Sequence, residues 1–584
     1  MNTLTRPSGS RLWMLALGII ILLALGLRVL ALDYGLPAVF NPDETPILNR
    51  ALALAKGDPN PHNFLYPSVY FYGVFAWESL FFLVGRATGM FASLAAFQTE
   101  FFTDPSRVFL AARLFTAVCG TLTAAALYWF GNRLYGRSAG LVGALFYAVA
   151  PIAVRDAHYV KLDVPVALVV VCAHVALARL VVDREAAARS RTWVVAGLVA
   201  GLSISTQYYV GMIVLSFVAV ALADLPRHRL WQESVRLIAW AAAGVILGFF
   251  AGTPFILVEP QTAVRDIVAV WQIDVDRAVV GASAFVSLGA YLKMLLRDAV
   301  GWPVCLAAVA GAVWAIVADW RRGLLLLTFP LLFLAFLANT VPMTRYLNSM
   351  LPFVALTAAV AVARIARFAG NRASLAAAAI AIVAAVPGLT ASIRTDLFLG
   401  QADTRALAGE FIEANVPAGS SILIQPYSAP LRQSRDALVE ALRANLGSAE
   451  RASVRFRLQL AHASSVSPTY RMIYLGRGGE DADKLYVAPA VFQADTDLAT
   501  LRRMNIDYVV LKRFNPPDPN IQPLVRALER RARLLAEFSP YRADIDPATR
   551  AAVSPFVHNT ALRIDPSLER PGPIMQVWRI ERSE

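Results

Sequence analysis

Ionisable residues gather in two short stretches that lie between long apolar runs of the sequence. The first stretch contains the adjacent carboxylates Asp43 and Glu44. The second covers residues 155–163 and holds five ionisable side chains, Arg155, Asp156, His158, Lys161 and Asp163. A carboxylate can accept the proton of a hydroxyl or hold a metal ion, and cations can stabilise a departing oxyanion. Together, the two stretches contain the groups that a reaction with a phosphate leaving group needs.

Each stretch also has a purely structural interpretation. Asn41, Pro42 and Glu44 have the types and spacing of a helix-capping pattern, which gives Glu44 a role outside catalysis. That pattern does not explain Asp43, for which we favour a functional role. The second stretch has the alternative of a solvated turn in which Asp163 caps the next helix. For Glu44 and for the second stretch, both interpretations stay open.

Three more positions are candidates for contact with a substrate. His62 and Tyr66 follow Asp43 and precede an aromatic stretch, residues 70–77. Aromatic residues at the membrane surface often anchor a protein to lipid headgroups. A histidine in a loop is often only in contact with solvent. Arg345 follows a short polar segment between two apolar runs, where an arginine commonly extends its charge towards water. The topology described below places Arg345 externally, where positive charge is disfavoured, and this favours anion binding.

The elements that position these groups must be membrane helices. Of the 584 residues, 57% are hydrophobic and 16% are charged, and the mean hydropathy is +0.54. Such a chain is too apolar to bury its hydrophobic residues inside a water-soluble domain. The net charge of +13 comes from arginines in short clusters between apolar runs. These clusters indicate membrane topology rather than nucleic-acid binding, so the lipid bilayer is the expected partner.

The sequence predicts a polytopic α-helical protein with about eleven spans. A span needs about 20 apolar residues to cross a hydrocarbon core, although several of these runs are shorter. The predicted spans are residues 12–31, 108–130, 139–154, 164–182, 193–206, 208–222, 237–251, 302–317, 324–338, 346–362 and 375–391.

One apolar segment, residues 67–84, is ambiguous because it is rich in aromatic residues and carries Glu78 in its middle. If it lies along the membrane surface, all five basic clusters between the spans fall on the side of the N-terminus, as the positive-inside rule requires. We therefore predict a cytoplasmic N-terminus, a first external loop at residues 33–107 with juxtamembrane helices, and an external C-terminal region. The expected location is the inner or plasma membrane.

The composition changes abruptly after residue 391. Helical patterns at residues 404–415 and 431–446 alternate with short apolar strands at residues 421–425, 508–512 and 575–580. This pattern predicts a soluble α/β or α+β domain. The chain then divides into a transmembrane domain, residues 1–395, and an external, extracytoplasmic or periplasmic domain, residues 396–584.

Several short motifs, taken in order, resemble the GT-C superfamily of polyprenyl-phosphate-sugar-dependent glycosyltransferases. The likeness is greatest to the branch of the protein O-mannosyltransferases and the lipid A aminoarabinose transferase, and it covers nearly the whole membrane part. The motifs are Pro42-Asp43-Glu44, Tyr66-Pro67, Leu134-Tyr135-Gly136-Arg137, and His158-Tyr159 with Asp163-Val164-Pro165. The sequence departs from the family at Gln207-Tyr208, where a lysine often precedes the tyrosine, and it lacks the Trp-Trp-Asp signature of oligosaccharyltransferases.

The resemblance implies a GT-C-like fold and a glycosyltransferase that moves a hexosyl or pentosyl group from a polyprenyl-phosphate donor to an acceptor hydroxyl. It implies Asp43 as the catalytic base of an inverting reaction, with Glu44 beside it and Asp163 as a second acidic residue. The candidates for substrate binding are His62, Tyr66, Arg155, His158, Lys161 and Arg345, of which the cations would stabilise the phosphate. A lipid-linked donor suits an external site that has no nucleotide sugars, and the sequence has no Gly-rich phosphate loop.

Several points stay open. The acceptor is a glycan, a lipid or a protein, and a divalent cofactor such as Mg²⁺ or Mn²⁺ would have Asp43 and Asp163 as ligands. A lipid or glycan transporter or flippase would also have many spans, but it usually places its sites near the bilayer midplane within an internal repeat. A non-enzymatic assembly or sensor protein would not need two acidic loops. If the chain is a transferase, Asp43 and Asp163 should face one pocket.

Overall fold

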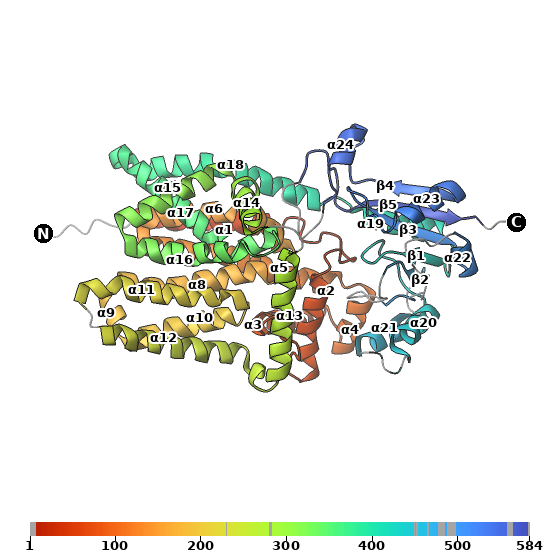
Figure 1. The fold of residues 1–584 in the computed structure, drawn as a ribbon, viewed down its shortest axis with the longest axis horizontal. Coiled ribbons are helices and arrows are strands. Elements are labelled where there is room, and N and C mark those ends of the chain that lie inside the picture. The colour runs from red at the N-terminus through yellow and green to blue at the C-terminus, as the bar shows by residue number, and fades with distance from the viewer. Residues whose placement is uncertain are drawn as a thin grey trace. The chain divides into compact units, whose positions relative to one another are not determined.

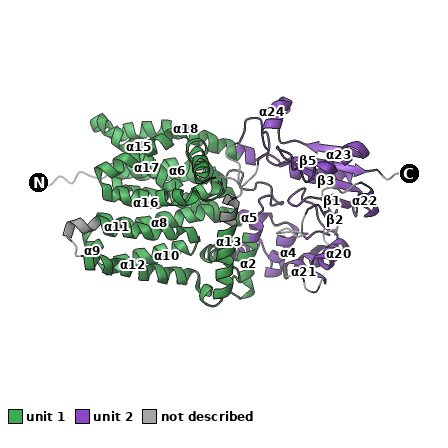
Figure 2. Cartoon of the chain, in the orientation of Figure 1, with its two compact units in different colours: residues 1–32, 47–78, 111–396 green, residues 33–46, 79–110, 397–584 purple. Residues whose placement is uncertain are grey.

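The computed structural model describes residues 8–228, 231–279, 283–448, 450, 452, 454–463, 467–476, 485–487, 498–556 and 564–581. Contacts divide the chain into two compact units (Figure 2). Unit 1 comprises residues 1–32, 47–78 and 111–396, and unit 2 comprises residues 33–46, 79–110 and 397–584. The polar C-terminal region therefore forms one unit together with two parts of the predicted first external loop. The division into functional domains at residue 395 stays a prediction.

Unit 1 is built from helices (Figure 1), and each of the eleven predicted apolar runs is helical. The corresponding helices are α1 (Ser8–Val29), α5 (Ser106–Tyr135), α6 (Arg137–Ala148) with α7 (Pro151–Arg155), α8 (Asp163–Val182), α10 (Ser190–Ile204), α11 (Ile213–His228), α12 (Trp231–Gly252), α15 (Trp302–Ala318), α16 (Trp320–Leu337), α17 (Leu351–Ala366) and α18 (Ala373–Leu399). The connections hold α2 (Glu44–Ala53), η1 (Leu54–Lys56), α3 (Val69–Ala87), η2 (Asp156–His158), α9 (Arg184–Ala188), η3 (Tyr208–Met212), η4 (Pro254–Leu257), α13 (Pro260–Val279), α14 (Ala284–Met294), η5 (Leu295–Ala299), η6 (Thr344–Ser349) and η7 (Arg367–Arg372).

Length and composition confirm that the chain is a polytopic helical membrane protein. Within the described parts of the chain, six helices are long and apolar enough to cross a membrane, or up to eight if each of two bent pairs is one span. Two shorter apolar helices, Ser190–Ile204 and Tyr208–Ala223, accompany them. The ambiguous helix α3 is not among these candidates, in keeping with its predicted place along the surface. The count of eleven spans stays a prediction.

Helices α10 and α12 lie side by side because glycines let their backbones approach closely (Figure 1). Each helix carries two glycines four residues apart, the spacing that allows close contact between membrane helices. A Cβ atom at any of the four would collide with a backbone carbonyl oxygen of the other helix. The colliding pairs are Gly197 with Ala241, Gly201 with Val245, Gly244 with Val194, and Gly248 with Leu198.

Unit 2 contains a five-stranded mixed sheet in the order β2-β1-β3-β5-β4. The inner strand β1 (Ser421–Ile424) pairs in parallel with β2 (Arg471–Tyr474) and with β3 (Tyr508–Arg513). Strand β5 (Ile574–Ile580) is antiparallel to both β3 and β4 (Ala532–Phe538). The helices of this unit are α4 (Leu94–Thr103), α19 (Thr404–Asn415), α20 (Arg435–Leu446), α21 (Val454–His462), α22 (Leu498–Arg503), α23 (Gln522–Arg531) and α24 (Pro547–Ala552).

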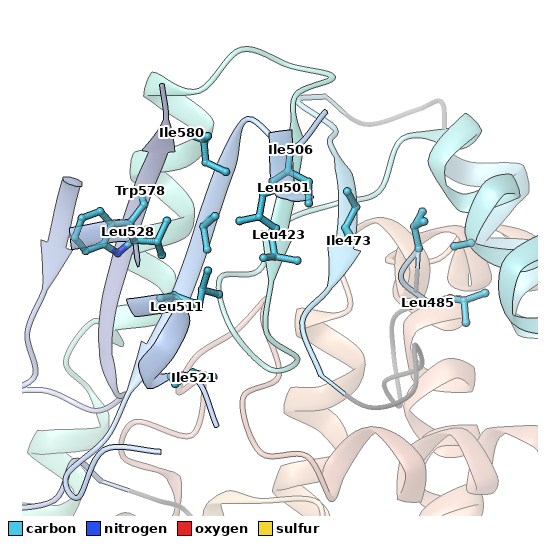
Figure 3. Close-up of a cluster of buried hydrophobic side chains, with 14 of the residues drawn as sticks. Leu423, Ile473, Leu485, Leu501, Ile506, Leu511, Ile521, Leu528, Trp578 and Ile580 are labelled. Carbon is cyan, nitrogen blue, oxygen red and sulfur yellow. The ribbon is translucent and has the colours of Figure 1, made fainter. Parts of the chain in front are cut away.

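Successive strand residues point to opposite sides of the sheet, and in β1, β2, β3 and β5 most of them are buried, whereas the edge strand β4 is partly exposed. On one face, Leu423, Ile473 and Val509 join residues from the helices α20, α22 and α23 in one apolar cluster, part of which is shown in Figure 3. On the other face, Ile422 and Ile424 pack with residues of α19. Helices therefore cover the sheet on both sides, and the predicted small α/β or α+β domain is confirmed.

The topology can be checked with reporter fusions. The placement of the basic clusters predicts a cytoplasmic N-terminus and an external C-terminal region. A periplasmic phosphatase fused after residue 581 should be active, whereas the same reporter fused after residue 188, in the Arg184–Ala188 connection, should be inactive. Fusions of a cytoplasmic fluorescent reporter provide the reciprocal control. Fluorescence from the C-terminal fusion would contradict both the eleven-span topology and an external site.

Candidate functional site

The carboxylates Asp43 and Glu44 lie in unit 2, where the chain enters helix α2. Asp43 is half-buried, and its amide N–H donates to Oδ1 of Asn41 at 3.1 Å. Glu44 begins the helix and is fully buried, and its amide N–H donates to the carbonyl oxygen of Asn41 at 3.2 Å. Asn41 therefore organises the turn that precedes α2. Asp43 keeps part of its surface accessible, as a base that meets a substrate requires.

The second stretch is not a solvated turn. Its five ionisable side chains are all buried, with between 0% and 7% of their surface exposed. The stretch runs through α7 and η2 into the first turn of α8, inside unit 1. Burying a charge is costly unless the charge has partners. The solvated-turn interpretation is therefore wrong, and the partners of these groups define what they can do.

Arg155 and Asp156 form a buried ion pair that continues into the segment before α17. Nη2 of Arg155 lies 2.8 Å from Oδ1 of Asp156 and donates to Oγ1 of Thr344 at 2.8 Å. The amide of Asn348 donates to the other carboxylate oxygen of Asp156 at 2.7 Å and to the carbonyl oxygen of Arg345 at 3.0 Å. Much of the bonding capacity of Arg155 is therefore used to fix η6, which carries Arg345.

His158 holds the end of α1 against the second stretch. Its Nδ1 lies 2.9 Å from the carbonyl oxygen of Val154, and its Nε2 lies 2.7 Å from that of Leu30. The carboxylate of Asp396 is 3.6 Å from Nε2. Since both ring nitrogens face protein oxygens, this geometry favours a positioning role for His158 over a direct contact with phosphate.

Asp163 and Arg345 belong to one polar region of unit 1. Both act electrostatically on Tyr209, whose hydroxyl shares a hydrogen bond of 2.9 Å with Oγ of Ser349. The guanidinium of Arg345 also lies over the ring of Tyr346, 5.3 Å from its centroid. The region thus brings together a carboxylate and a cation that are about 180 residues apart in the sequence. It can bind an anion while it holds a second polar group of the same ligand.

His62 and Tyr66 lie on a first-loop segment of unit 1 that is attached to α13 and the residue before it. His62 is exposed, with Nε2 2.9 Å from Asp58 and Nδ1 2.5 Å from Glu259. The hydrogen bonds that the His62 ring makes to the carboxylate of Asp58, which has the larger effect, and to that of Glu259 raise the pKa of His62. Tyr66 is half-buried and interacts electrostatically with Arg50. Whether Asp43 and these unit 1 residues share one pocket stays a prediction.

Comparison with known proteins identifies the fold. Residues 88–254 match the family model of the dolichyl-phosphate-mannose-protein mannosyltransferases. The structure is similar to that of ArnT from Cupriavidus metallidurans in the apo state, with a TM-score of 0.53, 14% sequence identity, and coverage of 91% of this chain and 97% of that chain. The chain has the GT-C fold of these proteins, and its matched segment resembles the mannosyltransferase family.

Two further solved structures share this GT-C fold. ArnT bound to undecaprenyl phosphate aligns with a TM-score of 0.52 and 13% identity over 91% of this chain and 97% of that one. The apo oligosaccharyltransferase of Archaeoglobus fulgidus aligns with a TM-score of 0.52 and 11% identity over 97% of this chain and 88% of that one. No curated protein matches the sequence. The resemblance to GT-C enzymes inferred from the motifs is confirmed.

Two adjacent tyrosines, to which the sequence alone assigned no role, connect polar groups of unit 1. The hydroxyl of Tyr208 donates to the carbonyl oxygen of Phe64 at 2.9 Å, beside Tyr66. The hydroxyl of Tyr209 reaches Ser349 in the Arg345 segment. The two side chains therefore join the His62–Tyr66 segment to η6. In the sequence, both tyrosines directly follow Gln207, the position at which the chain departs from the pattern of the GT-C family. That departure was the signal that could have drawn attention to them.

Two buried arginines lie inside predicted spans of unit 1. Arg28 in α1 donates from Nη1 to the carbonyl oxygens of Ala24 and Ala148, each at 3.0 Å. Arg113 in α5 donates to the carbonyl oxygen of Leu32 at 3.0 Å. A charged residue inside an apolar run is the signal that could have found them. Both fix the end of α1, from which the chain leads to Asp43.

The expected metal site is not supported by the described residues. They contain no group of three or more His, Cys, Asp or Glu side chains placed to hold a metal ion. Asp43 and Asp163 lie in different units. A divalent cofactor therefore stays a prediction, and the chemistry below uses only side chains of this chain.

Proposed function

We propose that this protein transfers a sugar from a polyprenyl-phosphate-linked donor to an acceptor hydroxyl at the external face of the membrane. The observation that carries the proposal is the family match to residues 88–254. The matched range contains residues 155–163, whose charged side chains are all buried in the structure. Burial of five ionisable groups is costly, and functional sites are where such groups concentrate.

The donor is the first half of the proposal. One structure with the same fold contains undecaprenyl phosphate, and the matched family is named for a dolichyl-phosphate-linked sugar. A lipid-linked sugar reaches the enzyme through the bilayer, which suits a site at the end of apolar helices. Arg345 and Lys161 are the proposed cations for the phosphate, because much of the bonding capacity of Arg155 is used by Asp156 and Thr344.

The reaction is an inverting displacement at the anomeric carbon. The acceptor oxygen attacks this carbon while its proton passes to the carboxylate of Asp43. The bond between the anomeric carbon and the phosphate oxygen breaks, and the polyprenyl phosphate leaves with both electrons from the opposite face of the sugar. A carboxylate must accept the proton because the pKa of a hydroxyl lies far above neutrality. Asp163 is proposed to orient the donor beside Arg345.

The test uses purified full-length protein in lipid nanodiscs. Undecaprenyl-phosphate-linked mannose, glucose and 4-aminoarabinose, each radiolabelled in the sugar, are supplied as donors, with an extract of envelope glycans and lipids as acceptor. We expect release of undecaprenyl phosphate from one donor and transfer of the label to an acceptor fraction. Arg345→Gln should raise the apparent KM for that donor. Arg394→Gln, on the helix α18, is the control and should leave this KM unchanged.

The alternatives give different results in the same assay. A transporter or flippase would bind a donor without breaking its phosphate bond, so a donor that binds but stays intact in the presence of acceptor would overturn the proposal. An assembly or sensor protein would neither bind nor consume any of the donors. Donor binding with an unchanged KM in Arg345→Gln would remove only the phosphate assignment.

A further inference from the structure

A cavity in unit 2 lies outside the polar region of unit 1. Its volume is about 220 Å³. Its walls come from two parts of the predicted first external loop, residues 37–45 and 101–109, and from the C-terminal domain. Phe40 and Thr45, which flank the Asp43–Glu44 pair in sequence, both line it. The cavity is therefore built partly by the segment that carries the proposed base.

The cavity lies beside the loop that follows the inner strand β1. In α/β sheets, ligands bind beyond the carboxyl ends of the strands, where neighbouring strands are reached by connections in opposite directions. Strand β1 lies at such a position, because the chain passes from β1 to β2 on one side of it and then to β3 on its other side. The next residues include Tyr427 and Ser428, which line the cavity. Tyr427 has a positive φ of 52°, a strained conformation for a bulky residue, and such residues cluster at functional sites.

Two residues that line this cavity each carry a side-chain oxygen without a hydrogen-bond partner among the residues that the structure describes. The side chain of Ser428 is only 3% exposed, and its Oγ makes no hydrogen bond. Oε1 of Gln459, on the helix α21, is also buried without a partner. An unsatisfied buried polar atom lowers stability, so its presence needs an explanation. A ligand with hydroxyl groups, bound in the cavity, would supply the missing hydrogen bonds to both oxygens.

The rest of the lining indicates the chemistry of this ligand. Phe40, Phe101, Phe102 and Phe109 line the cavity, and Arg432 and His462 are its ionisable residues, with no carboxylate among the described lining residues. Aromatic walls with a few polar groups suit a ring that has apolar faces and hydroxyl edges, and the cationic lining disfavours a positively charged one. The volume is below the roughly 300–1,000 Å³ typical of sites for drug-sized ligands. It therefore suits a single sugar ring rather than a lipid chain or a peptide.

We infer that this cavity binds one sugar ring of the acceptor, which makes the acceptor a glycan or glycolipid rather than a protein. The statement that this sugar belongs to the acceptor rests on the proposed function. The binding of a sugar in the cavity does not. Ser428 Oγ and Gln459 Oε1 hydrogen-bond to ring hydroxyls, and the phenylalanine side chains pack against the ring faces. The sugar is held on the segment that leads to Asp43, so the acceptor chain extends from the cavity towards the base.

Ser428→Ala separates a ligand-binding hydroxyl from a structural one. If the hydroxyl serves a ligand, its removal leaves the stability of the free protein unchanged or raises it, because a buried unsatisfied group is lost. If the hydroxyl has a structural role, the melting temperature of Ser428→Ala falls. Ser420→Ala, at the amino end of β1, is the matched control, because Oγ of Ser420 donates to the carbonyl oxygen of Pro417 outside the cavity.

The experiment is saturation-transfer NMR on the full-length protein in nanodiscs without any donor. The probes are the methyl glycosides of mannose, glucose, galactose and N-acetylglucosamine, with pentaerythritol as a polyol that has no ring. We expect saturation of the ring protons of at least one glycoside and no signal for pentaerythritol. Loss of one hydrogen bond weakens binding by about fivefold, so Ser428→Ala and Gln459→Leu should each reduce the signal, while Ser420→Ala should not.

The results distinguish this inference from the proposed function. Absence of saturation transfer for all four glycosides would overturn the inference, as would signals that persist unchanged in both cavity variants. A fall in melting temperature in Ser428→Ala would also contradict it. If the glycosides bind but no donor is consumed in the transfer assay, the cavity is a carbohydrate site and the proposed reaction is wrong. If a donor is consumed and no glycoside binds, the reaction stands without this acceptor class.

Discussion

Asp43→Asn should reduce sugar transfer by roughly 100-fold or more, while the protein still folds and inserts into the membrane. The substitution keeps the size of the side chain and most of its hydrogen bonding but removes its basicity. Asp43 is half-buried, and its backbone amide, which the substitution does not change, donates to Asn41 at this turn. The measurement is the initial rate of transfer from the labelled polyprenyl-phosphate donor, normalised to the amount of purified protein.

Two matched variants sharpen this prediction. Asp33→Asn changes an exposed carboxylate of the same loop and should leave the rate unchanged. Glu44→Gln changes the buried neighbour, and its rate should fall less than that of Asp43→Asn if Glu44 mainly supports the start of α2. A rate close to normal in Asp43→Asn would remove this residue as the base. Asp163 would then be the next carboxylate to test.

Asp156→Ala should destabilise the protein by about 3–5 kcal/mol, the usual effect of removing one partner from a buried ion pair. The change leaves the guanidinium of Arg155 buried without its carboxylate and also removes the acceptor of Asn348. Unfolding in a denaturing detergent, followed by circular dichroism, measures the difference. Since the pair fixes η6, donor binding through Arg345 should weaken as well.

An exposed ion pair provides the control for this stability effect. Arg189 and Glu185 lie 3.2 Å apart, but most of both side chains is in contact with solvent. Solvent screening makes such a pair contribute little, so Glu185→Ala should leave the unfolding transition almost unchanged. If Asp156→Ala and Glu185→Ala lost equal stability, burial would not be the reason why the Arg155–Asp156 pair stabilises the protein. Replacement of both Arg155 and Asp156 by apolar residues of similar size should restore much of the stability.

The membrane helices could be predicted from the sequence because lipid imposes a simple requirement on each segment. An apolar run in a bilayer must satisfy its own backbone hydrogen bonds, and a helix does so locally. Every predicted run is helical for this reason. The strands β1, β3 and β5 were also found, since each is a short apolar run between turns. Strand β4 was missed because it follows α23 directly, without a glycine or proline to mark the change.

The candidate site could be predicted only in part. The types and order of Asp43, Arg155 and Asp163 were visible, but the pairing of Arg155 with Thr344 joins residues 189 positions apart. A single sequence does not reveal which distant segment covers a charged stretch. The second stretch was therefore given a solvated turn as an alternative, whereas the segment at residues 344–348 buries it.

The glycine contacts between α10 and α12 also constrain how the protein is made. Helix α11 lies between the two helices in the sequence, so α10 and α12 can meet only after the segment that joins them has been made. Backbone atoms touch at four places, and each of the four glycines lies where any side chain would collide with the partner helix. A substitution at these positions would thus act on assembly rather than on chemistry. Inherited or engineered changes there should appear as protein that is synthesised, inserted and then degraded.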